Sequence, residues 1–150
     1  MPENCRIIAV TDERRELVAP EWLARAEGVH RQLRPKLPAG YAAKMKLVFD
    51  QGGEMCVAVI DGEVAGLAVF RVFENTHVGR RFYVDDLVTG EKHRSTGVGK
   101  ALIAWLEGEA RRRACPGLDL ESGTHRTEAH RFYFREGFVI PSFSFRKDFP

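Results

Sequence analysis

The sequence predicts one α/β domain built on a mixed, twisted β-sheet, and three features lead to that prediction. The length of 150 residues suits a single domain with a hydrophobic core. A hydrophobic fraction of 44% and a charged fraction of 29% are typical of globular proteins. Hydrophobic residues recur with a helical period in some segments and a strand period in others. Because no repeat, low-complexity tract or linker interrupts the chain, we treat residues 1–150 as one domain.

The first part of the chain predicts a short strand followed by two helices. An apolar run favours a strand over residues 5–10. Apolar residues three and four positions apart predict an amphipathic helix over residues 20–33, which ends before two prolines. Residues 40–50 predict a second helix that ends at a pair of glycines.

The pattern then changes to a strand period, with predicted strands at residues 55–60, 64–73 and 81–89. Asp61-Gly62 predicts a tight hairpin between the first two, because a type I′ turn requires positive φ at both central residues.

The last part of the chain alternates helices and strands again. Residues 98–113 predict a long helix with basic residues in its last turn, where they suit the helix dipole. A strand at residues 118–122 and a helix at residues 128–136 follow, the helix closed by Gly137. Residues 138–140 and 142–146 predict a terminal hairpin around a proline. The predicted sheet therefore has about six or seven strands, flanked by about four helices.

Composition argues against several other classes of protein. A formal net charge of +2 is too small to indicate nucleic-acid binding, and we see neither a recognition helix nor an aromatic-basic strand face. Three cysteines at scattered positions and no closely spaced Cys/His set indicate reduced thiols and no metal site. His125 and His130 are five residues apart and do not share a helical face. No segment has the length of a membrane span, and we expect a cytoplasmic protein.

The turn from His93 to Lys100 has the features of a phosphate-binding site. Gly97 and Gly99 lie between a predicted strand and a predicted helix, where free backbone N–H groups and the helix dipole favour an anion. A Walker A loop would need a glycine at the position of Arg94, and a dinucleotide-binding fingerprint would need one at Leu102. Two glycines alone fit a simple strand-to-helix turn equally well.

The flanking residues resemble the cofactor motif of the GNAT superfamily of N-acetyltransferases. Arg94-x-x-Gly97-x-Gly99 matches that motif position for position, after a strand and before a long helix. The second motif of the family, Asn-x-x-Ala-x-x-Phe/Leu-Tyr-x-x-x-Gly-Phe, is also present. Here it reads Arg126-x-x-Ala129-x-x-Phe132-Tyr133-x-x-x-Gly137-Phe138.

The resemblance implies a GNAT-like acyl-CoA N-acyltransferase fold with acetyl-CoA as co-substrate. Main-chain groups of Leu87, Val88 and Thr89 are expected to pair with pantetheine. The pyrophosphate is expected to bind the turn, at the residues Arg94, Ser95, Thr96, Gly97, Val98, Gly99 and Lys100. Arg126 replaces the family's asparagine, and we assign it no cofactor contact.

The resemblance also implies three catalytic residues. Asp85 and Asp86 precede the cofactor strand segment, where family members use the first acid of such a pair as a base or relay. Alternation places the two side chains on opposite faces unless a bulge intervenes, and we favour Asp85 on the face of Leu87. Asp86 is then a substrate-amine or structural partner, and a water chain remains an alternative base. Tyr133 is expected to be the acid that protonates the cofactor sulfur, with Phe132 as core.

The motifs do not specify which amine receives the acetyl group. The acidic pair, with Phe49, Phe73 and Phe143, favours a small cationic amine, while a protein N-terminus or lysine is the alternative. A catalytically idle acyl-CoA sensor on the same fold is the rival from another class. Such enzymes commonly form dimers, and a homodimer is a further open expectation.

Overall fold

The computed structural model describes Pro2 and residues 4–150. The chain divides into two compact units, residues 1–119 and 120–150. The strands are β1 (Arg6–Ala9), β2 (Glu54–Ile60), β3 (Glu63–Asn75), β4 (Gly79–Thr89) and β5 (Leu118–Leu120). The helices are α1 (Pro20–Leu33), α2 (Tyr41–Asp50), α3 (Val98–Arg112) and α4 (Thr127–Arg135), with a short 3-10 helix, η1 (Glu91–His93).

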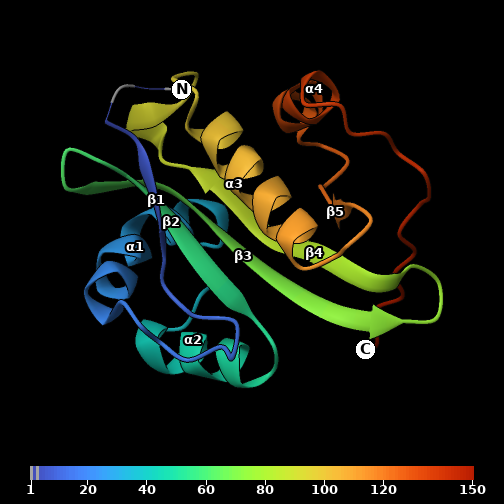
Figure 1. Ribbon diagram of the computed structural model, residues 1–150, viewed down its shortest axis with the longest axis horizontal. Coiled ribbons are helices and arrows are strands. Elements are labelled where there is room, and N and C mark those ends of the chain that lie inside the picture. Colours follow the sequence, from blue (N-terminus) through green and yellow to red (C-terminus); the bar gives the residue numbers. More distant parts are fainter. Residues whose placement is uncertain (1, 3) are drawn as a thin grey trace. The chain divides into compact units, whose positions relative to one another are not determined.

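The strands follow the order β1-β2-β3-β4-β5, and β1 to β4 form an antiparallel meander (Figure 1). The predicted hairpin between β2 and β3 is confirmed, because Asp61 has φ 50° and Gly62 has φ 77°. Helices α1 and α3 of the first unit both contact the long β3–β4 hairpin.

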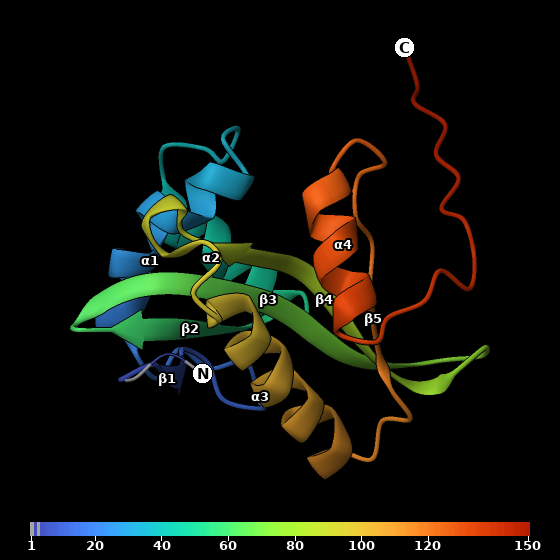
Figure 2. The same ribbon diagram turned by 90° about the horizontal axis from the view of Figure 1, so that it is seen from above.

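In the first unit, α1 and α2 cover one face of the sheet and α3 covers the other, as Figure 2 shows. Leu23 of α1 and Met45 of α2 are buried with Val69 of β3 in one apolar cluster. On the opposite face, the ring of Phe70 stacks on Phe82 and meets Trp105 of α3 edge to face. The amphipathic pattern of the helices thus decides which face each one covers.

A β-bulge in β4 interrupts this alternation. Val69 pairs with Asp86, but the next residue of β3, Phe70, pairs with Val84. Asp85 is therefore an extra residue in β4 with no pairing partner in β3. Directly paired residues share a face of the sheet, so Asp86 lies on the α1–α2 face with Val69.

The predicted terminal hairpin is wrong. The described residues contain no strand after β5, and residues 138–150 form no regular secondary structure. Phe143 and Phe145 are 82% and 94% exposed. Their alternating pattern suits a strand, but a strand also needs a partner for its hydrogen bonds, and local sequence does not supply one. The sheet accordingly has five strands instead of the expected six or seven.

The remaining elements confirm the predicted mixed α/β fold, with bounds that differ by a few residues. Gly137 follows α4 with φ 88°, the left-handed conformation expected there. In the part of the chain that the structure describes, no helix is both long and apolar enough to cross a bilayer. That residues 1–150 act as one acetyltransferase domain stays a prediction.

Candidate functional site

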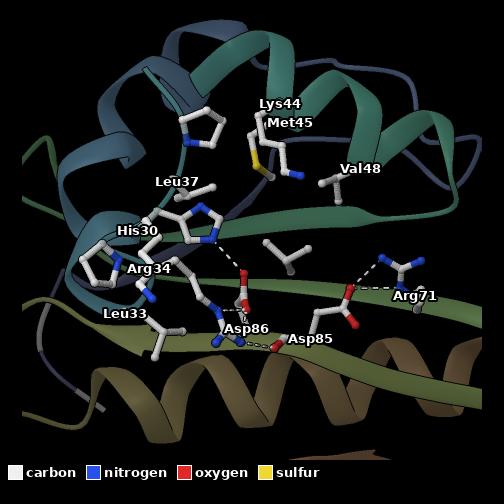
Figure 3. Close-up of a pocket in the computed structure, with 14 residues that line it drawn as sticks. His30, Leu33, Arg34, Leu37, Lys44, Met45, Val48, Arg71, Asp85 and Asp86 are labelled. Carbon is white, nitrogen blue, oxygen red and sulfur yellow. Dashed lines mark hydrogen bonds and ion pairs between the residues drawn. The ribbon is translucent and has the colours of Figure 1, made fainter. Parts of the chain in front are cut away.

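An open pocket of about 530 Å³ lies between the α1–α2 face of the sheet and the segment that joins α1 to α2 (Figure 3). Its size is in the range of small-molecule sites. Apolar side chains such as Leu33, Met45 and Val69 line it together with charged ones. The charged residues and the histidine are His30, Arg34, Lys36, Lys44, Arg71, Asp85 and Asp86.

Both acids of the predicted catalytic pair line this pocket, because the bulge at Asp85 changes the alternation of β4. Leu87 pairs with Ala68 and therefore lies on the opposite face from Asp86, which pairs with Val69. Asp85 lies in the pocket beside Asp86, so the expectation that it shares the face of Leu87 is wrong. The bulge, which pairing with β3 reveals, is the physical reason.

Asp86 is bound by two side chains, one from His30 in α1 and one from Arg34, the residue that follows α1. Its Oδ2 lies 2.7 Å from Nε2 of His30, and its Oδ1 accepts a hydrogen bond of 2.8 Å from Nε of Arg34. Arg34 also donates to the backbone carbonyl of Asp85 at 3.1 Å. Arg34 therefore binds both Asp85 and Asp86 and connects the bulge to the C-terminal end of α1.

The charge of Asp86 is stabilised by these partners. Burial by itself opposes ionisation, but the hydrogen bonds from His30 and Arg34 and the positive charge of Arg34 outweigh it and hold the pKa of Asp86 below its ordinary value. Asp86 is thus a fixed carboxylate with both oxygens engaged, which suits a positioning residue better than a base.

His30 links Asp86 to Tyr41 of α2. His30 is 1% exposed, and its Nδ1 lies 2.8 Å from the Tyr41 hydroxyl. An ionised Asp86 only accepts hydrogen bonds, so Nε2 of His30 carries a proton and donates it. Burial, with the nearby charges of Glu27 and Asp86, raises the pKa of Tyr41, which keeps the phenol protonated and able to donate to Nδ1.

Asp85 differs from Asp86 in having an available oxygen. Nε and Nη2 of Arg71 donate to the same atom, Oδ2 of Asp85, at 2.9 and 2.7 Å. Among the described residues, none donates to Oδ1 of Asp85. Of the two acids that line the pocket, Asp85 is therefore the one with a carboxylate oxygen that no described residue occupies (Figure 3).

The turn predicted to bind pyrophosphate precedes α3 as expected. Gly97 is the N-cap of α3, has φ 91°, and provides no side-chain cap. The first N–H groups of α3 therefore have no partner within the helix and are suited to an anion. Arg94, Ser95, Thr96 and Lys100 are exposed, whereas the buried Val98 side chain leaves only its backbone available. The Thr96 hydroxyl donates to the His93 carbonyl within the turn.

The three residues predicted to pair with pantetheine end strand β4. Val88 is 8% exposed and belongs to the core on the α1–α2 face, while Leu87 and Thr89 are half-buried. Their contacts with a cofactor stay predictions.

Tyr133 lies in the second unit, on α4. It is 9% exposed, and the rings of Phe132 and Phe138 each lie 5.5 Å from its own, centroid to centroid. Burial raises the pKa of Tyr133, and the neighbouring Arg126 opposes this rise without reversing it. Phe132, expected as core, is only half-buried. The role of Tyr133 as an acid stays a prediction.

Sequence reasoning missed His30, Tyr41, Arg34 and Arg71. A signal existed for His30 alone, since it occupies a core-facing position of α1 and a buried polar side chain needs a partner. Of the aromatic residues expected near the acceptor, Phe49 is 4% exposed and packs in the core. No group of three or more metal-ligating side chains occurs among residues 2 and 4–150.

The chain is similar to known N-acetyltransferases in sequence. The model of the acetyltransferase (GNAT) family matches residues 15–138. An uncharacterized N-acetyltransferase of Bacillus subtilis, YhdJ, is 36% identical over 94 residues, covering 53% of this chain and 66% of that protein. An aminoalkylphosphonate N-acetyltransferase of Salmonella typhimurium is 32% identical over 109 residues, covering 72% of this chain and 69% of that protein. The matched segments thus span about two thirds of each relative's length.

Solved structures share the fold at lower identity. A ribosomal-protein-alanine N-acetyltransferase from Brucella melitensis has a TM-score of 0.79 at 19% identity, over 97% of this chain and 99% of that one. The aminoglycoside N-acetyltransferase AAC(6')-Iy, solved with a bisubstrate analogue of CoA, has a TM-score of 0.77 at 17% identity, over 96% and 98% of the two chains.

Proposed function

Because the chain belongs to the GNAT family of acetyltransferases and is thus an acyltransferase, we propose that it transfers an acetyl group from acetyl-CoA to a small primary amine bound in the α1–α2 pocket. The observation that carries this proposal is the available Oδ1 of Asp85, a residue that lines a pocket of small-molecule size beside β4. The relative named as an aminoalkylphosphonate N-acetyltransferase supports a small molecule as acceptor over a protein N-terminus or lysine.

The residues at the start of α3 fit the pyrophosphate of acetyl-CoA. The uncapped N-terminus of α3 presents free backbone N–H groups, and Gly97 places no side chain in their way. Exposed Arg94 and Lys100 add positive charge at the same turn. Pantetheine would pair with the backbone of residues 87–89. The short β5, with three residues against eleven in β4, can pair with only part of the outer edge of β4.

Acetyl transfer requires that the amine lose its extra proton, since a primary ammonium has a pKa of about 10. Asp85 would hold the ammonium through Oδ1 and pass this proton to solvent. The nitrogen lone pair then attacks the thioester carbon, so that the C–N bond forms and the C–S bond breaks. Tyr133 would protonate the departing sulfur and regain a proton from the acylated nitrogen. One proton is released overall, with the amide and free CoA as products.

Asp86 acts in this scheme as a positioning residue. Its two oxygens are occupied by His30 and Arg34, and Arg34 also binds the carbonyl of Asp85. The network therefore holds the bulge so that Asp85 faces the pocket.

The proposal is tested first by thermal shift and then by a thiol-release assay. Acetyl-CoA at about 100 times its dissociation constant should stabilise the fold by ~2.7 kcal/mol. Thiol release should then appear with small amines. Binding of acetyl-CoA without transfer to any amine would instead indicate an acyl-CoA sensor, and no shift at all would overturn the proposal.

The role of Asp85 is tested by the pH dependence of kcat/KM in Asp85→Asn. We expect the largest loss of rate at low pH, where fewer acceptor amines are already neutral. Asp86→Asn is the comparison variant. It should lower the free energy of unfolding and leave the shape of the pH profile of kcat/KM largely as it is in the wild type. An unchanged profile in Asp85→Asn would remove Asp85 from the role of base.

A further inference from the structure

The charges that line the α1–α2 pocket are unbalanced. Two carboxylates, Asp85 and Asp86, face four cationic side chains, those of Arg34, Lys36, Lys44 and Arg71. The carboxylates form ion pairs with the two arginines, Asp85 with Arg71 and Asp86 with Arg34.

Lys36 and Lys44 have no such partner. The side chain of neither lysine forms an ion pair or a hydrogen bond with another described residue. The charge of each arginine is balanced by the carboxylate that it binds. The two lysines therefore leave the lining of the pocket with an excess of two positive charges.

The two lysines are placed on ordered parts of the first unit. Lys44 belongs to α2 and lies on the opposite side of the pocket from Asp85 of β4 (Figure 3). Lys36 lies in the segment that joins α1 to α2. Arg31 fastens that segment by donating to the carbonyls of Leu37 and Pro38 at 2.6 and 2.7 Å.

We infer that the acceptor is a small primary amine that also carries an anionic group. Its ammonium would bind Oδ1 of Asp85, and its carboxylate or phosphonate would bind Lys36 and Lys44. This inference rests on the proposed function and specifies the substrate class of the same site. A diamine would fit the acids alone, but its second cation would lie near two unpaired ammonium groups and be repelled.

The inference is tested with four acceptors of similar length in the thiol-release assay. They are β-alanine, 2-aminoethylphosphonate, 3-amino-1-propanol and 1,3-diaminopropane. We expect kcat/KM to be highest for one of the two anionic amines, and their order identifies carboxylate or phosphonate as the preferred anion. A preference for the diamine or the amino alcohol would overturn the inference.

Lysine variants locate the effect in the pocket. Lys44→Gln and Lys36→Gln should each reduce the ratio of kcat/KM for the anionic acceptor over the amino alcohol by about threefold to fivefold. Lys46→Gln is the matched control, since Lys46 lies on the same helix, does not line the pocket, and pairs with Asp50 at 2.8 Å. An unchanged ratio in the Lys36/Lys44 double variant, or an equal fall in Lys46→Gln, would overturn the inference.

The thiol-release assay and the thermal shift distinguish failure of the anionic acceptor from failure of acetyl transfer. Thiol release that is fastest with the diamine leaves the proposed acetyl transfer intact and refutes only the anionic acceptor. Failure of acetyl-CoA to shift the melting temperature refutes the proposed function itself.

Discussion

Replacing Tyr41 with phenylalanine removes one hydroxyl group from the buried network that holds Asp86. Tyr41 is 4% exposed and His30 is 1% exposed, so water does not replace the lost partner freely. The hydrogen bond of 2.8 Å between the Tyr41 hydroxyl and Nδ1 of His30 disappears, and the imidazole is left with an unpaired acceptor.

The size of the effect follows from that burial. Leaving one buried polar atom without a partner costs about 1–3 kcal/mol. For a chain of this length each kcal/mol lowers the melting temperature by about 2–4 °C. We therefore expect Tyr41→Phe to lower the free energy of unfolding by about 2 kcal/mol and the melting temperature by about 4–8 °C.

The assay combines urea unfolding with kinetics at a temperature where all variants are folded. Thr11→Val is the matched control, because the buried Thr11 Oγ1 accepts a hydrogen bond of 3.0 Å from the backbone N–H of Met55, outside the pocket. Both variants should lose similar stability. Only Tyr41→Phe should also lower kcat/KM, because His30 positions Asp86 at the bulge.

Two results would refute this reasoning. A change in the unfolding free energy of Tyr41→Phe below about 0.5 kcal/mol would mean that the hydroxyl makes no effective bond to His30. A ¹⁵N spectrum that places the proton of neutral His30 on Nδ1 would contradict the assigned tautomer.

Three further predictions concern Tyr133, Gly97 and Asp86. Tyr133→Phe should lower kcat with little change in acetyl-CoA affinity, and a lost affinity in a folded variant would indicate a packing role instead. Gly97→Ala should cost about 1–2 kcal/mol, because φ is 91° there, and should reduce the thermal shift with acetyl-CoA; an unaltered shift would exclude this turn from the cofactor site. The pKa of Asp86 is lowered on folding, so its ionised form adds stability above its unfolded pKa of about 3.9 and loses it as the pH falls through the lower folded pKa. The stability difference between wild type and Asp86→Asn, measured by urea unfolding, should be constant above about pH 5 and shrink below about pH 4; a difference that stays constant to pH 2 would contradict this assignment.

Local patterns were sufficient to predict most of the fold. Helix α1 has the predicted bounds because its apolar spacing and the prolines after it are both local signals. The hairpin at Asp61-Gly62 is equally local. The terminal hairpin was wrong because its strands depend on hydrogen-bonding partners elsewhere in the chain.

The candidate site was predictable only in part. The acidic pair could be found from its place before the cofactor motif, but its arrangement depends on pairing between β3 and β4, which creates the bulge. Arg34 and Arg71 lie 52 and 14 residues from the acids that they bind, and no sequence signal links them. The network therefore required the tertiary structure.

The bulge in β4 has a consequence for how such a pocket can change in evolution. In a regular strand, a substitution alters one side chain and leaves the facing of every other residue as it was. Here the extra residue, Asp85, separates two stretches of regular pairing, so that its loss would remove a carboxylate while Asp86 kept its partner Val69. Deletion of the single codon for Asp85 would then remove one acid from the pocket and leave the facing of the paired residues on both sides of the bulge unchanged.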